Sequence, residues 1–107
     1  MVGQLRYICV ETGDIPEAKA FYTWTLGLHI KEEGESWFTL EAGALSVIVW
    51  QGPTHGTLMG FVEPELEAAH NRLKAQGADV GEISPNPGGR HFYVTGPDDT
   101  QVIVFDD

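Results

Sequence analysis

The segment GGRHFYVTGPDDTQVIVFDD, residues 88–107, decides the fold, because apolar residues alternate on both sides of its Gly-Pro-Asp-Asp turn. Two such runs around a turn predict a pair of β-strands, at about 90–95 and 101–106. One face of the pair is aliphatic or phenylalanine: Phe92, Val94, Val102 and Val104. The other face carries His91, Tyr93, Ile103 and Phe105. Both faces are largely apolar, so the face with His91 is expected to border something other than solvent.

The rest of the chain divides into two modules of the same order, strand, helix and three strands. Module one, about 1–52, has expected strands at 4–11, 28–33, 36–41 and 45–51. Its helix begins after an Asp14 cap, packs through Ala18, Phe21, Tyr22 and Leu26, and ends at Gly27. Module two, about 56–107, has expected strands at 57–62, 79–83, 90–95 and 101–106, and a helix from Pro64 to Gly77 that packs through Leu66, Ala69 and Leu73. The prediction is one α+β domain, residues 1–107, of two tandem βαβββ modules, with the Pro- and Gly-rich loop 82–89 as a mobile lid or rim.

Composition limits the functions that the chain can have. Sixteen acidic residues against six basic ones give a formal charge of −10, which repels phosphate backbones and makes nucleic acid an unsuitable partner. The sequence has no run of about 18 apolar residues and no signal peptide, so we expect a cytoplasmic protein without a membrane partner. Cys9 is the lone cysteine, which agrees with a reducing compartment, and we expect it to be a small buried hydrophobe.

The strands also separate into an aliphatic face, expected under the helices, and a mixed face. The aliphatic set is Ile8, Val10, Phe38, Leu40, Val47, Val49, Met59, Phe61, Phe92, Val94, Val102 and Val104. The mixed set is Tyr7, Cys9, Glu11, Trp37, Thr39, Glu41, Ser46, Ile48, Trp50, Leu58, Gly60, His91, Tyr93, Ile103 and Phe105. This second face is too polar for a dry core and too aromatic for open solvent, which is typical of a ligand groove or an interface.

Three segments, GDIPEAKAFYTWTLGL, ELEAAHNRLKAQGADV and GGRHFYVTGPDDTQVIVF, together resemble the landmarks of the vicinal oxygen chelate superfamily, which includes glyoxalase I, bleomycin-resistance proteins and dioxygenases. The resemblance spans nearly the whole chain. It implies a mixed sheet curled around a concave groove, with the helices on its outer face. The chain departs from the family at Asp99, where the corresponding turn usually has glycine, although aspartate tolerates left-handed conformations better than most residues do.

Enzymes of that superfamily place metal ligands on the concave face. The corresponding positions of this chain are Tyr7, Leu58, Ile103 and Ile48 or its neighbour Val49. None suits a divalent metal, which prefers imidazole nitrogen or carboxylate oxygen, so we expect no catalytic metal and no cofactor. A shifted register could still bring His29, His55 and His91 into an unconventional site. His70 is expected to be a surface or helix-packing residue.

Three functions stay open. The favoured one is a non-catalytic binding protein that sequesters a cationic aromatic antibiotic of the bleomycin type in an acidic, aromatic-lined groove, as a homodimer. Its expected ligand contacts are Tyr7, Cys9, Trp37, Thr39, Ile48, Trp50, Leu58, His91, Tyr93 and Ile103, although Trp37 and Trp50 could instead fill the dimer interface. The second is a metal-independent enzyme that uses His91 for proton transfer and Tyr93 as a hydrogen-bond donor, and the third is a structural or regulatory dimerisation module.

Overall fold

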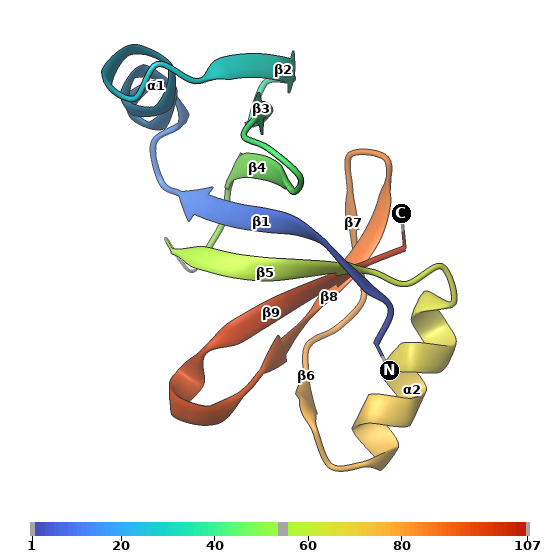
Figure 1. The fold of residues 1–107 in the computed structure, drawn as a ribbon. Helices are drawn as coiled ribbons and strands as arrows, with labels where there is room; N and C mark the ends of the chain where they lie inside the picture. Colours follow the sequence, from blue (N-terminus) through green and yellow to red (C-terminus); the bar gives the residue numbers. More distant parts are fainter. Residues whose placement is uncertain (1, 54–55, 107) are drawn as a thin grey trace. The chain divides into compact units, whose positions relative to one another are not determined.

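The computed structural model describes residues 2–53 and 56–106 (Figure 1). The chain divides into two compact units, one formed by residues 7–58 and the other by residues 1–6 together with 59–107. We call them the N-terminal unit and the C-terminal unit. The predicted α+β class is confirmed. The first module has the predicted order of strand, helix and three strands, and the second has the same order with one additional short strand, β7 (Ser84–Asn86).

The N-terminal unit is a small sheet with one helical segment. Its elements are β1 (Gln4–Thr12, whose first three residues belong to the other unit), α1 (Ile15–Lys19), β2 (His29–Glu33), β3 (Trp37–Glu41) and β4 (Ser46–Gln51). The strand order is β2-β3-β4-β1, with β1 parallel to β4 and the other two pairs antiparallel. The predicted strands agree with these to within a residue or two.

The helix of this unit changes its geometry half-way along. Its start is as predicted, because the Asp14 side chain accepts a hydrogen bond of 2.9 Å from the Glu17 amide. After Lys19 the chain forms a π-helix, Ala20–Thr25, in which the Leu26 amide donates to the Phe21 carbonyl five residues back. The Thr23 hydroxyl contributes to this change, since it donates to the Lys19 carbonyl at 2.7 Å.

This π-helix corrects one prediction. A regular helix would turn Phe21 and Leu26 towards the sheet, but their side chains are 47% and 53% exposed. Ala18 and Tyr22 do pack on the core, which is formed by Phe38, Leu40 and Val49 with Val10, Ile15, Leu28, Ile30 and Val47 around it. The aliphatic strand face predicted from alternation is thus confirmed for this unit. The predicted packing of the helix is wrong at Phe21 and Leu26, which the wider turn of the π-helix displaces.

The C-terminal unit repeats this topology. Its elements are β5 (Thr57–Val62), α2 (Leu66–Ala75), β6 (Asp79–Val80), β7 (Ser84–Asn86), β8 (Gly89–Thr95) and β9 (Gln101–Phe105). The strand order is β5-β9-β8-β6, with β5 parallel to β9 and β8 antiparallel to β9. The loop 82–89 is not the free lid that was predicted, because β7 pairs with β8 in a short hairpin (Figure 1).

The core of this unit is formed by Leu66, Phe92 and Val104, with Val2, Leu73, Val80, Ile83 and Val94 packed against it. Phe92, Val94 and Val104 of the predicted aliphatic face lie in this core, whereas the Met59 side chain is exposed. Gly3 brings the start of the chain to this core. It has a φ of 107°, and a Cβ atom there would collide with the Val62 carbonyl. Glycine is therefore required at this position.

The turn between β8 and β9 explains how the chain does without the expected glycine. Asp98 and Asp99 both adopt left-handed backbone angles, with φ of 58° and 60°. Aspartate adopts this conformation at lower cost than most residues do. The Gly96 amide closes the turn by donating to the Thr100 carbonyl at 2.6 Å.

Candidate functional site

A hollow of about 420 Å³ lies at the end of β1 in the N-terminal unit. It is lined by Val10, Glu11, Thr12, Glu17, Ala18, Phe21, Tyr22, Gly56 and Thr57. Two of these side chains are carboxylates and two are aromatic rings. We call this feature the acidic hollow. The sequence analysis placed Glu11 on the mixed face but missed the hollow itself, because Phe21 was assigned to the core.

Glu11 is the most enclosed polar group of the hollow. Only 2% of its surface is exposed, although it is a carboxylate. Its Oε2 accepts a hydrogen bond of 2.9 Å from the indole Nε1 of Trp50. The parallel pairing of β1 with β4 sets this contact, because it places Glu11 directly beside Trp50 in the ladder. A buried carboxylate needs such donors to offset its lost hydration.

The backbone around Glu11 is shaped to leave room for its side chain. The Glu11 amide donates to the Gly56 carbonyl at 2.7 Å, which holds the end of β1 in place. A Cβ atom on Gly52 would lie 2.6 Å from the Glu11 carboxyl carbon, closer than atoms in contact can approach. Gly52 is therefore required for the observed position of the carboxylate. Glu11 is held by a backbone and a side-chain partner, which makes it a fixed feature of the wall.

Cys9 lies two residues before Glu11 on the same face of β1, and it is fully buried. Burial, and to a lesser degree the negative charge of Glu11, raises the pKa of the Cys9 thiol from 9.0 to about 12. The thiol therefore keeps its proton at neutral pH and is not a nucleophile. The expectation of a buried, unreactive cysteine is confirmed.

The other predicted contacts of the N-terminal unit share the face of β1, β3 and β4 that carries Cys9. Trp37 pairs with Trp50, Thr39 with Ile48, and Tyr7 with Ser46 in the strand register. All are at least partly buried, and Leu58 is buried as well. The Trp37 indole lies against Gly34, where no larger residue would fit. The structure brings these residues together on one face, and their contact with a ligand stays a prediction.

In the C-terminal unit the predicted contacts are His91, Tyr93 and Ile103. His91 lies beside Tyr93 with the ring centroids 5.5 Å apart in an edge-to-face arrangement, and Tyr93 pairs with Ile103 in the ladder. The His91 Nδ1 lies 3.1 Å from Oδ1 of Asn86 on β7. Asn86 donates its Nδ2 to the Pro87 carbonyl at 3.0 Å, which leaves Oδ1 to accept. Nδ1 of neutral His91 is therefore the protonated nitrogen, and Asn86 is a positioning residue that sequence reasoning missed.

The sequence of the chain matches a known family model over most of its length. A model of the "Glyoxalase/Bleomycin resistance protein/Dioxygenase superfamily" matches residues 4–104. The chain belongs to this superfamily. No curated protein matches the sequence of this superfamily member.

Solved structures resemble this superfamily member in fold. A chain titled as an NAD-dependent benzaldehyde dehydrogenase from Legionella pneumophila is 15% identical, with a TM-score of 0.76 over 92% of this chain and 96% of that one. A superfamily member from Vibrio splendidus 12B01 is 19% identical, with a TM-score of 0.68 over 97% of this chain and 100% of that one. Homoprotocatechuate 2,3-dioxygenase from Arthrobacter globiformis is 22% identical, with a TM-score of 0.64, and 97% of this chain covers 36% of the dioxygenase. At these identities the likeness concerns the fold alone.

The side chains at the positions that the resemblance assigns to metal ligands do not fit a divalent metal. They are Tyr7, Ile48, Leu58 and Ile103, a phenol and three hydrocarbon side chains, of which Leu58 and Ile103 are buried. These groups offer no imidazole or carboxylate. Among residues 2–53 and 56–106, no group of three or more His, Cys, Asp or Glu side chains is placed to hold a metal ion.

The remaining histidines do not form a shared site in the described part of the chain. His29 is exposed on β2, and His55 lies outside the described residues. The Nε2 of His70 lies 2.8 Å from the Gly81 carbonyl, and its ring packs edge-on against Phe92. The helix-packing role expected for His70 is confirmed. None of the helices in residues 2–53 and 56–106 has the length and apolar character needed to cross a membrane.

The Trp50 hydrogen bond should contribute measurably to stability. We expect Trp50→Phe to lower the free energy of unfolding by about 1–3 kcal/mol, because the buried Glu11 carboxylate loses a donor. Urea denaturation followed by circular dichroism measures this change. Trp24→Phe is the matched control, since Trp24 is 88% exposed and should change stability by less than about 0.5 kcal/mol. Equal effects of the two substitutions would contradict the role given to this hydrogen bond.

The Cys9 thiol should be protected and should make stability depend on pH. In the folded state its pKa is about 12 against 9.0 for an ordinary thiol, so the folded protein binds more protons between these values. This contribution to stability is complete below pH 9 and is lost as the pH rises towards 12. At pH 8 we expect a disulfide reagent such as DTNB to label native protein far more slowly than urea-unfolded protein. Labelling at the same rate in both states would refute the burial of the thiol.

Proposed function

We propose that this superfamily member is a non-catalytic binding protein whose ligand is a small aromatic cation, held in the acidic hollow. The observation that carries the proposal is the hollow itself, where the Phe21 and Tyr22 rings lie beside two acidic residues. The Glu11 side chain leaves β1 on the face opposite to Val10, where it is buried and fixed by Trp50, and it adds negative charge from the protein interior. A carboxylate kept in a low-dielectric wall attracts a positive charge more strongly than one in water does. Glu17 supplies a second, exposed carboxylate at the same hollow.

The aromatic side chains of the hollow support the same ligand class. Phe21 and Tyr22 meet edge to face, with centroids 5.1 Å apart and planes at 78°. Two rings at nearly a right angle offer two differently directed faces, and cations are attracted to such faces. The π-helix is what leaves Phe21 exposed at the hollow while Tyr22 packs on the core. A flat cation can thus meet a ring and a carboxylate together.

The charge of the whole chain and the superfamily name point to one type of cation. The formal charge of −10 attracts cations to the surface and speeds their encounter. Bleomycin resistance is one of the activities for which the superfamily is named. We therefore propose sequestration of a bleomycin-type antibiotic, with the predicted cytoplasm as the place where it acts. Trp37 and Thr39 stay proposed as further ligand contacts.

Isothermal titration with bleomycin and with benzyltrimethylammonium tests this proposal. We expect both to bind, and we expect Phe21→Leu to weaken the binding of benzyltrimethylammonium by about 2- to 5-fold, because one cation–ring contact is lost. Glu17→Gln should weaken the binding of bleomycin and of benzyltrimethylammonium by a similar factor.

Glu35→Gln is the matched control for charge, because Glu35 is an exposed acid outside the hollow. It should leave both affinities nearly unchanged. If neither cation binds, or if Glu35→Gln weakens binding as much as Glu17→Gln does, the acidic hollow is not the binding site.

A second candidate function is favoured by one observation. Asn86 fixes the His91 ring with Nδ1 protonated, which makes Nε2 the basic nitrogen of the neutral ring. A histidine oriented in this way is suited to proton transfer, and Tyr93 lies beside it. This arrangement supports the alternative of a metal-independent enzyme. The binding function keeps the stronger support, because the acidic hollow combines a cavity with a charge opposite to that of the proposed cation.

The predicted homodimer is also kept as a proposal, and the surface of the π-helix supports it. Trp24 is 88% exposed, and Phe21 and Leu26 beside it are about half exposed. An exposed group of large apolar side chains is typical of a contact surface. A second copy of the chain is the proposed partner.

Sedimentation velocity should show a dimer of the 11.7 kDa chain, which Trp24→Ser should shift towards monomer. Added salt should favour the dimer, because it screens the repulsion between two chains of charge −10. Leu5→Ser is the control, since Leu5 is an exposed apolar residue on β1 and not on the π-helix. A monomeric wild-type protein, or a Trp24→Ser variant as dimeric as wild type, would rule out this surface.

A further inference from the structure

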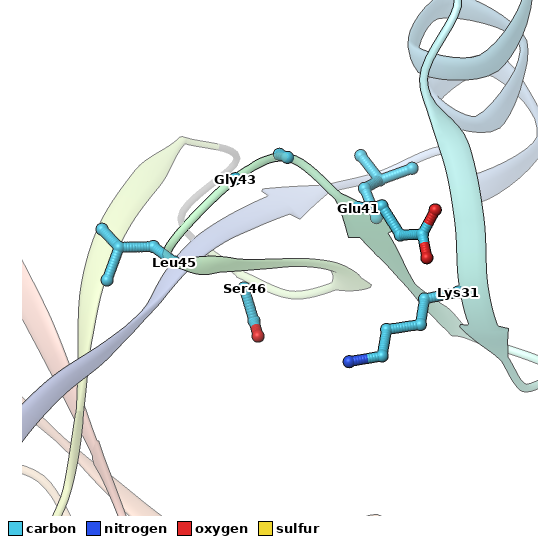
Figure 2. A pocket seen from close by; sticks show the side chains of 7 residues that line it. Lys31, Glu41, Gly43, Leu45 and Ser46 are labelled. Atoms are coloured by element: carbon cyan, nitrogen blue, oxygen red, sulfur yellow. The ribbon is translucent and has the colours of Figure 1, made fainter.

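A second hollow, of about 280 Å³, lies where β2, β3 and β4 of the N-terminal unit meet (Figure 2). It is lined by Lys31, Leu40, Glu41, Ala42, Gly43, Leu45 and Ser46. None of these residues lines the acidic hollow. We call it the bulge hollow, because an irregularity of β2 forms one of its walls.

That irregularity is a β-bulge at Lys31. His29 pairs with Glu41 and Ile30 with Leu40, but the next pair joins Glu32 to Thr39, so Lys31 is an extra residue without a partner in the ladder. The Thr39 hydroxyl accepts a hydrogen bond of 3.1 Å from the Glu32 amide, which holds the displaced backbone. Bulges redirect a side chain and are frequent beside binding sites.

The strand register places the other two polar groups on the same side of the sheet. Leu40 and Val47 pair across β3 and β4 and pack on the core, so the adjacent Glu41 and Ser46 point to the opposite face. Figure 2 shows the Lys31 side chain reaching from β2 beneath β3, with the Ser46 hydroxyl directed into the same space and the Glu41 carboxylate above Lys31. An ammonium, a hydroxyl and a carboxylate therefore border one hollow.

The two charges of the bulge hollow do not neutralise each other. Ion pairs hold Lys19 and Arg90, but within the described residues none reaches Lys31 or Glu41. A simple anion would be attracted by Lys31 but repelled by Glu41 and by the charge of −10 on the chain. A simple cation would be repelled by Lys31. Both side chains are exposed, and a ligand that carries both charges can meet the two groups together.

We propose that the bulge hollow binds a small zwitterion, an α-amino acid with a short apolar side chain. Its carboxylate meets the Lys31 ammonium and the Ser46 hydroxyl, and its ammonium meets Glu41. Ala42 adds an apolar side chain to the lining. The volume of about 280 Å³ is at the lower end of ligand sites, which suits a molecule of this size.

Amide chemical-shift titrations with three matched probes test this proposal. L-alanine carries both charges, propionate lacks the ammonium and ethylamine lacks the carboxylate. We expect L-alanine to shift the amides of Lys31 and of residues 42–46 in a saturable manner, with a Kd of about 1–10 mM. Propionate and ethylamine should each bind at least about fivefold more weakly, because each loses one charge contact. No saturable shift with L-alanine, or equal binding of all three probes, would overturn the proposal.

Two substitutions and two controls locate the site. Lys31→Met and Glu41→Gln should each weaken the binding of L-alanine by about fivefold. The controls Lys74→Met, on α2, and Glu35→Gln should leave this affinity unchanged. Thr39→Val should also weaken binding, because it removes the acceptor that holds the bulge, and Thr39→Ser should preserve it. The same spectra show whether each variant is folded. A Lys31→Met or Glu41→Gln variant that is folded and binds L-alanine like wild type would refute the site, whatever the outcome for the acidic hollow.

Discussion

Burial of the Glu11 carboxylate is the constraint on which the N-terminal unit depends. Taking a carboxylate out of water costs several kcal/mol, and only well-placed donors offset that cost. The parallel ladder places the Trp50 indole beside it, and Gly52 leaves the space that its side chain occupies. The same negative charge helps to keep the Cys9 thiol protonated. An aliphatic residue at position 11 would avoid this cost.

Both hollows of this unit arise from departures of the backbone from regular geometry. The π-helix leaves Phe21 at the acidic hollow, and the bulge turns Lys31 into the bulge hollow. In each case a threonine hydroxyl holds the irregular backbone, Thr23 through the Lys19 carbonyl and Thr39 through the Glu32 amide. Regular elements build the core, and these local changes supply the side chains that a ligand could meet.

The sequence was sufficient for the framework because the framework follows from short-range patterns. Alternation of apolar residues located the strands, and the Asp14 cap located the start of the first helix. Apolar alternation and capping residues could not predict the π-helix, the Lys31 bulge or β7. Each of these depends on hydrogen bonds to residues that have no place in a periodic apolar pattern. Residues 84–86 contain a proline, which argued for a loop, but a three-residue edge strand tolerates it. The burial of Glu11 could not be predicted because it depends on the register of β1 against β4, and no local sequence pattern specifies that register.

The placement of residues 2–6 affects the order in which the molecule can form. Val2 and Gly3 pack with the C-terminal unit, whereas residues 7–58 form the other unit. During synthesis, residues 2–6 are made before the residues that they pack against, which follow residue 58. The N-terminal unit can gain its contacts while this leading segment is still unbound, and the segment must then close a loop of more than fifty residues. Synthesis of the residues after 58, and not the appearance of β1, is therefore the step that allows the C-terminal core to be completed.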